Sequence, residues 1–148
     1  MRALGARLAK AIHSAQLSTP LVIGLSGDLG AGKSTLAAGL LEALGHHGPV
    51  RSPTYTLVEP YRFADLDVYH CDLYRLRVPE EFEDLGIRDL LVNRSVLIVE
   101  WPERAGDRLP AIDLALRFDY LAAGRMVALD AVSAAGHAVV ARLGLDRS

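Results

Sequence analysis

The chain has 148 residues, of which 51% are hydrophobic and 23% are charged, and this composition is typical of a folded globular protein rather than a disordered one. Its formal net charge of −2 argues against unaided, tight binding to nucleic acid, which normally requires a basic surface. A single cysteine excludes an internal disulfide framework, and no apolar run approaches the roughly 18 residues that span a bilayer. We therefore expect one domain over residues 1–148, in the cytoplasm and without a membrane partner.

The first two elements predicted are a helix over residues 4–16 and a strand over residues 21–25. Leu4, Leu8 and Ile12 recur at the spacing of one helical face. Ser-Thr-Pro at 18–20 ends that helix, and the apolar run after it is short enough to be a buried strand.

Residues 27–35 read Gly-Asp-Leu-Gly-Ala-Gly-Lys-Ser-Thr, which satisfies the P-loop pattern that cradles phosphates. The pattern needs a strand before it and a helix after it, and leucines at helical spacing follow it. Lys33 is then expected to reach the β- and γ-phosphates, and the Ser34 hydroxyl to hold Mg²⁺. The alternative is a Gly-rich turn with an ordinary surface lysine. We expect the whole loop to bind the nucleotide: Gly27, Asp28, Leu29, Gly30, Ala31, Gly32, Lys33, Ser34 and Thr35.

Two β-rich segments, residues 55–61 and 66–73, are joined by a short polar link and predict an antiparallel hairpin. Residues 79–86 predict a short helix, with Pro at its first position, acids in the first turn and Gly after its end. A sheet that contains both this hairpin and the P-loop strand is mixed rather than purely parallel.

The apolar run at 96–99 ends in Glu100 and predicts a central strand that is covered on both faces. A loop over residues 101–110 follows. Residues 112–119 and 126–132 predict two strands joined at Ala-Gly, and a helix is expected over residues 135–143.

Three acidic residues stand out beside the P-loop, and one of them, Asp28 inside the loop, is expected to shape the loop or to contact a partner. Glu100 stands where P-loop proteins place an acid near the metal and the attacking water, so it can orient water, accept a proton or hold Mg²⁺ through water. The alternative is a solvated acid at a strand end. In a strand, Asp72 shares one face with His70 and Tyr74, and it needs a cation or donors there. Either Mg²⁺ or an ion pair with Arg75 meets that need.

Four further residues are weaker candidates. Thr54 follows the P-loop helix, where many nucleotide switches place a threonine that senses the γ-phosphate. Trp101 either packs near the nucleotide or plugs the end of the sheet. Cys71 points opposite to Asp72 and is expected in the core. His70 and Cys71 lack the spacing of a zinc site.

Two absences favour ATP over GTP as the nucleotide. The only asparagine, Asn93, is not followed by the Lys-x-Asp of the guanine-reading motif. The only glutamine, Gln16, lies in the first predicted helix and is not placed to orient water.

Four motifs in order together resemble the bacterial TsaE (YjeE) family. They are the P-loop at 27–35, Ser-Pro-Thr-Tyr-Thr-Leu-Val at 52–58, Tyr-His-Cys-Asp-Leu-Tyr-Arg-Leu at 69–76 and Val-Glu-Trp-Pro-Glu at 99–103. The resemblance covers about residues 4–143. It implies an α/β fold, a three-layer α/β/α P-loop NTPase domain with a mixed, mainly parallel sheet.

The resemblance also implies an activity. TsaE-like proteins are weak, Mg²⁺-dependent ATPases that act with TsaB and TsaD to install threonylcarbamoyl on the adenosine beside the anticodon of tRNA, which the partners hold. It implies that Ser34, Asp72 and Glu100 lie at the metal, that Thr54 is the switch threonine and that Trp101 lies near the nucleotide. Most members carry Thr where this chain has Ser34, and the hydroxyl is kept.

Two other functions use the same P-loop and remain open on the residues alone. One is a small kinase acting on a nucleoside or another small acceptor, although about 150 residues leave little room for a lid and an acceptor pocket. The other is a module in which bound ATP holds an assembly together without useful hydrolysis.

Overall fold

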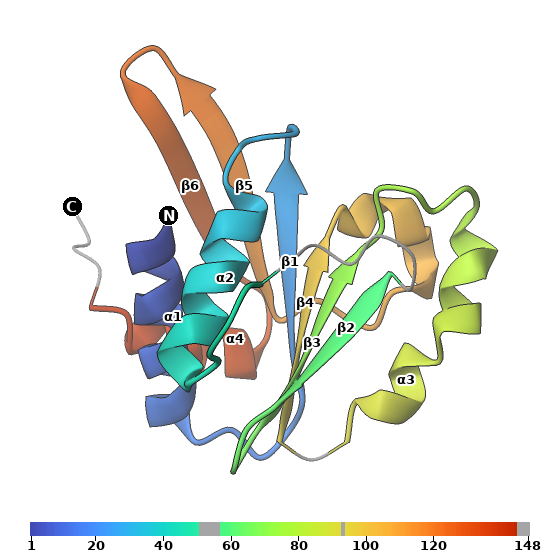
Figure 1. Cartoon of the computed structure of the whole chain (residues 1–148), viewed down its shortest axis with the longest axis horizontal. Helices are drawn as coiled ribbons and strands as arrows, with labels where there is room; N and C mark the ends of the chain where they lie inside the picture. Colours follow the sequence, from blue (N-terminus) through green and yellow to red (C-terminus); the bar gives the residue numbers. More distant parts are fainter. Residues whose placement is uncertain (51–56, 93, 145–148) are drawn as a thin grey trace.

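The structure, a computed structural model, describes residues 1–50, 57–92 and 94–144. It is built on a six-stranded sheet with strand order β2-β3-β4-β1-β5-β6 (Figure 1). The strands are β1 (Leu21–Gly27), β2 (Val58–Arg62), β3 (Asp67–Asp72), β4 (Ser95–Glu100), β5 (Leu114–Leu121) and β6 (Gly124–Ala131).

The sheet is mixed, because parallel strands form its centre and an antiparallel strand lies at each edge. β1 pairs in parallel with β4 and β5, and β3 pairs in parallel with β4. β2 and β6 are antiparallel to β3 and β5. Every residue of β4 is buried, as its continuous apolar run predicts.

Helices cover both faces of the sheet and make the fold a three-layer α/β/α arrangement. One layer holds α1 (Arg2–Ala15), α2 (Lys33–Leu44) and α4 (Ala134–Ala141), which pack on an apolar cluster that includes Ile23 and Ile98. The other holds α3 (Ile87–Leu90) and the 3₁₀ segments η1 (Pro79–Leu85) and η2 (Pro102–Arg108). These pack on a second cluster that includes Tyr69 and Leu97.

Two glycines allow α1 to approach α2 closely. A Cβ added at Gly5 would lie 2.2 Å from the Leu36 carbonyl oxygen, and one added at Gly39 would lie 2.4 Å from the Arg2 carbonyl oxygen. Any side chain at either position would force the helices apart, so this contact requires glycine. Since α2 begins at the P-loop, the close contact also anchors that loop.

Most of the predicted elements are confirmed, with shifts of a few residues at their ends. The predicted hairpin of residues 55–61 and 66–73 is the β2–β3 pair, of which residues 55 and 56 lie outside the described part. The loop predicted over residues 101–110 is wrong, because Pro102 starts the 3₁₀ segment η2 there. α3 had no clear signal, since it has four residues. Within the described residues, no helix is long and apolar enough to cross a membrane.

Candidate functional site

The P-loop has the predicted strand before it and the predicted helix after it. β1 ends at Gly27 and α2 begins at Lys33. Gly27, Gly30 and Gly32 have φ angles of 147°, 76° and 107°, a region that favours glycine. A Cβ added at Gly32 would also lie 2.8 Å from the Met1 Cγ atom. The turn therefore requires glycine, and it leaves the positive end of α2 facing the loop.

Lys33 is held inside the loop by the loop's own carbonyl oxygens. Its side-chain ammonium donates hydrogen bonds to the carbonyl oxygens of Gly27 and of Asp28, the latter at 2.8 Å. The Nζ atom lies 4.4 Å from the centroid of the Trp101 ring, which is a cation–π contact. Burial lowers the pKa of Lys33, and nearby acids, Glu100 first, oppose that shift. The lysine is thus placed where a phosphate would meet it.

Glu100 connects the P-loop helix to the middle of the sheet. The Ser34 hydroxyl donates to its two carboxylate oxygens, at 2.9 and 3.1 Å. The Nε2 atom of His70 lies 2.6 Å from Glu100 Oε2, and both side chains are almost fully buried. The carboxylate is therefore held on two sides before any ligand binds.

The register of three parallel strands brings these side chains together. Glu100 is the Cα partner of Asp72 on one side and of Leu25, near the end of β1, on the other. Because parallel strands end at the same edge, acids that are 28 positions apart in the chain lie beside the P-loop. Sequence spacing alone does not contain this register.

Asp72 lies beside Glu100 at the same edge of the sheet but has a different environment. Its carboxylate accepts a hydrogen bond from the Tyr74 amide at 3.0 Å, which shapes the turn after β3. Burial raises its pKa, and this backbone hydrogen bond opposes the shift. Within the described residues, Asp72 makes no ion pair with Arg75 or another cation. In the part of the chain that the structure describes, the ion-pair interpretation of Asp72 therefore finds no partner cation.

A pocket of about 340 Å³ gathers most of the predicted site residues. The pocket-lining side chains of Ser34, Asp72 and Glu100, the three residues predicted at the metal, carry oxygen atoms of the kind that Mg²⁺ prefers, and so does the Thr35 hydroxyl. The donor set therefore fits a magnesium ion. The lining residues are Leu29, Gly30, Gly32, Lys33, Ser34, Thr35, Asp72, Tyr74, Glu100, Trp101 and Arg125.

The backbone at Trp101 explains why its indole lies over the lysine. Trp101 has φ 61° and ψ 50°, a left-handed conformation that is uncommon outside glycine. Its amide donates to the Leu25 carbonyl oxygen at 3.2 Å, which ties this turn to the P-loop strand. The turn directs the indole toward Lys33.

Sequence reasoning did not name His70, Tyr74 or Arg125 as residues of this site, and it named one residue that is not described. His70 had a usable signal, because it stands two residues before Asp72 in a strand and its side chain therefore points to the same face. Arg125 had none, since nothing in its neighbourhood marks it as a ligand. Thr54 lies outside the described residues. Cys71 is buried as predicted, and burial raises the pKa of its thiol to about 12.

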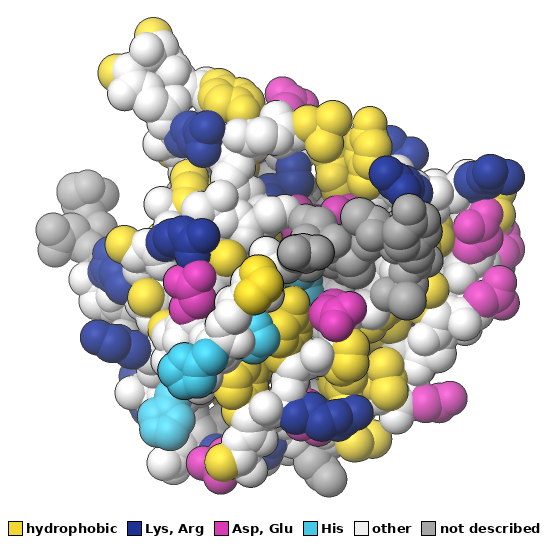
Figure 2. All heavy atoms as spheres, viewed as in Figure 1, with side chains coloured by type: hydrophobic (Ala, Val, Ile, Leu, Met, Phe, Trp, Pro, Cys, Tyr) yellow, Lys and Arg dark blue, Asp and Glu magenta, His cyan; other side chains and the backbone are white. Residues whose placement is uncertain are grey.

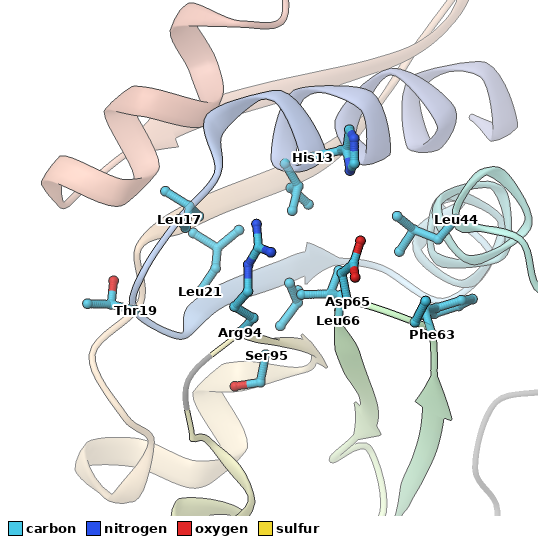
Figure 3. A pocket seen from close by; sticks show the side chains of 13 residues that line it. His13, Leu17, Thr19, Leu21, Leu44, Phe63, Asp65, Leu66, Arg94 and Ser95 are labelled. Atoms are coloured by element: carbon cyan, nitrogen blue, oxygen red, sulfur yellow. The ribbon is translucent and has the colours of Figure 1, made fainter.

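A second pocket, of about 210 Å³, lies at the opposite end of the strands (Figure 3). Leu21 and Ser95, at the starts of β1 and β4, line it, and the charged groups of Asp65 and Arg94 point into it. Its other lining residues are mainly apolar, and no predicted site residue is among them. The candidate site is therefore the pocket at the P-loop.

Comparisons with known proteins identify the family of this chain. A family model described as "Threonylcarbamoyl adenosine biosynthesis protein TsaE" matches residues 1–127. A Haemophilus influenzae protein named tRNA threonylcarbamoyladenosine biosynthesis protein TsaE is 41% identical over 140 residues, which cover 95% of this chain and 89% of the relative. A Streptomyces coelicolor protein of the same name is 43% identical over 122 residues, which cover 80% of this chain and 78% of the relative.

The fold comparison points to the same group of proteins. The crystal structure of Bacillus subtilis YdiB is similar to this chain with a TM-score of 0.71 and 26% sequence identity. The match covers 97% of this chain and 88% of YdiB.

Proposed function

The chain belongs to the TsaE family, and on that premise we propose that it is an ATPase of tRNA threonylcarbamoyladenosine biosynthesis. In this proposal it requires Mg²⁺, hydrolyses ATP slowly when alone, and is activated by TsaB and TsaD. One observation carries the proposal: the Ser34 hydroxyl and the Glu100 carboxylate are hydrogen-bonded inside a pocket that Lys33 and Asp72 also line.

Binding of ATP is assigned to the loop and to Lys33. The amides of the loop and the first turn of α2 point toward a phosphate, and the helix end adds a partial positive charge. On binding, the Lys33 ammonium would exchange the carbonyl oxygens of Gly27 and Asp28 for the β- and γ-phosphate oxygens. The ammonium would thus lose no hydrogen bonds on binding. The phosphate charge would also favour its protonated form, which burial disfavours in the ligand-free protein.

Ser34, Asp72 and Glu100 are the residues proposed to hold Mg²⁺. When bound, the ion would offset the negative charge of the phosphates during transfer. Burial raises the pKa of Asp72, while the Tyr74 amide and the charges of His70 and Lys33 oppose that shift, and a bound cation would oppose it further.

Glu100 is proposed to position the attacking water. The carboxylate is 2% exposed and is hydrogen-bonded to His70, so its orientation is set before ATP arrives. It would accept the water proton as oxygen attacks the γ-phosphorus and the bond to the ADP oxygen breaks. His70 would act through Glu100 as a positioning residue. Thr54 stays in the proposal as the switch threonine.

The acidic net charge fits a protein that meets tRNA only through its partners. A surface with a formal charge of −2 supplies little of the positive potential that tRNA binding needs. The names of the relatives favour tRNA modification over phosphorylation of a small acceptor.

The test is ATP hydrolysis by the purified protein, alone and with cognate TsaB, TsaD and tRNA. We expect slow hydrolysis that requires Mg²⁺ and is strongly stimulated by the pair. Fast hydrolysis that is indifferent to the pair, or phosphate transfer to a small acceptor, would overturn the proposal.

A further inference from the structure

The β5–β6 hairpin extends past the end of the P-loop strand. The last pairing of β1 with β5 is Gly27 with Phe118, whereas β5 continues to Leu121 and pairs there with Gly124 of β6. The hairpin thus projects beyond β1 and alongside the loop that follows it (Figure 1). Apolar side chains are visible at its tip in Figure 2.

Two side chains of this hairpin reach the P-loop. The Tyr120 hydroxyl donates to the Leu29 carbonyl oxygen at 3.3 Å. Arg125, the cross-strand partner of Tyr120, holds its guanidinium 5.4 Å from the centroid of the Tyr120 ring. Arg125 Nη1 would lie 3.3 Å from a Cβ added at Gly32, so the guanidinium is adjacent to the loop backbone.

Arg125 is a cation without a carboxylate partner among the described residues, although it lines the candidate pocket. Arg117, on the same hairpin, differs in this respect, because its Nε atom lies 3.1 Å from a carboxylate oxygen of Asp119. A guanidinium beside a phosphate loop is suited to bind phosphate oxygens through two parallel N–H donors.

The strand order determines which part of a nucleotide faces Arg125. Glu100 and Asp72 lie on β4 and β3, on one side of β1, and Arg125 lies on β6, on the other side. The phosphate to be transferred must lie beside the two acids and Ser34. The opposite flank therefore faces the α-phosphate and the nucleoside.

We propose that Arg125 is a nucleotide-binding residue that contacts the α-phosphate. The inference rests on the proposed function, since it assumes a nucleoside triphosphate in the pocket. It gives the hairpin a role in holding ATP and ADP alike, separate from the hydrolytic step at Glu100.

The experiment compares the affinities of four proteins for ATP and for ADP: the unmodified chain, R125A, R125K and R117A. Fluorescence of Trp101, the only tryptophan, and calorimetry both report binding. We expect R125A to lower the affinity for ATP and the affinity for ADP by the same factor, about tenfold. R125K should recover part of that affinity, because lysine keeps the positive charge but lacks the two parallel N–H donors of the guanidinium. R117A should bind as the unmodified chain does.

Two outcomes would overturn the inference. Unchanged affinity of R125A for both nucleotides would remove Arg125 from the site. A loss for ATP with none for ADP would place the residue at the γ-phosphate instead. K33A, measured in parallel, separates this inference from the proposed function. If K33A loses binding and R125A does not, only the role of Arg125 fails, whereas normal binding by K33A would refute the P-loop site itself.

Discussion

The two flanks of the P-loop are built in different ways. On the acidic flank, formed by His70, Asp72 and Glu100, the histidine is 0% exposed and the glutamate 2% exposed, and they share a 2.6 Å hydrogen bond. On the hairpin flank, Tyr120 is 52% exposed and Arg125 is also exposed. A group that acts on a reacting bond must be oriented in advance, and burial with hydrogen bonds does this. A group that only binds a ligand tolerates solvent.

This difference predicts unequal losses from substitutions around the loop. Substitution of Lys33, which lies between the two flanks, should cause the largest loss of ATP hydrolysis. Substitutions on the acidic flank should slow hydrolysis with little effect on the affinity for ATP. Changes on the hairpin flank, as argued for Arg125, should weaken binding without a specific effect on the chemical step.

Lys33→Ala should have the largest effect, because both flanks depend on the cation between them. We expect partner-stimulated ATP hydrolysis to fall at least about 10²-fold, since the β- and γ-phosphate charge loses its main counter-charge. The measurement is phosphate release with TsaB, TsaD and tRNA present. Hydrolysis at the normal rate would show that the loop is not the nucleotide site.

Glu100→Ala should separate binding from chemistry. We expect it to bind ATP in the presence of Mg²⁺ and to hydrolyse it at least about 10²-fold more slowly, which is the usual scale for loss of a positioned base. Glu100→Gln is the matched control, since it keeps the size of the side chain and most of its hydrogen bonds but replaces the basic carboxylate by a neutral amide. An alanine variant that hydrolyses ATP at the normal rate would exclude Glu100 from the mechanism.

His70→Leu should lower the hydrolysis rate about tenfold with little change in the ATP affinity, because Glu100 loses the group that orients it. His70→Gln is the conservative control, since its amide nitrogen can take the place of Nε2 beside the carboxylate. Steady-state kinetics separate kcat from KM here. If leucine and glutamine variants have the same kcat, the histidine fills space and does not position Glu100.

Asp72→Asn should give the smallest of these effects in the ligand-free protein, a small gain in stability. Its effect on hydrolysis should be in the opposite direction, a loss. Burial raises the pKa of Asp72 above 3.8, so the folded state holds this proton more tightly than the unfolded state does. Its contribution to stability is therefore greatest below the unfolded pKa and declines as pH rises through the folded pKa.

Removal of this charge should raise the Tm of the ligand-free protein at pH 7 by about 2 °C, while Mg²⁺-dependent hydrolysis falls. Thermal unfolding at pH 3.5 and pH 7 provides the internal control, because the gain should shrink at the lower pH. A gain that is equal at both values would show that the charge of Asp72 is not its cause.

Much of this fold was predictable from local patterns. The P-loop is a contiguous motif, and its glycines occupy positive φ as their type allows. The β2–β3 hairpin and the fully buried β4 follow from β-rich runs and their hydrophobicity. η2 was not predicted, because a 3₁₀ segment carries no periodic apolar signal of its own.

The chain's sequence by itself determined the local features of the candidate site, since a phosphate loop and two acids at strand ends can be read from short segments. Only the tertiary structure decided which side chains share the site. His70 meets Glu100 because β3 and β4 are parallel and in register, and Arg125 reaches the loop because β5 and β6 extend past β1. Both contacts join residues far apart in the chain, and they depend on which strands become neighbours in the sheet and how those strands align, which neither segment determines alone.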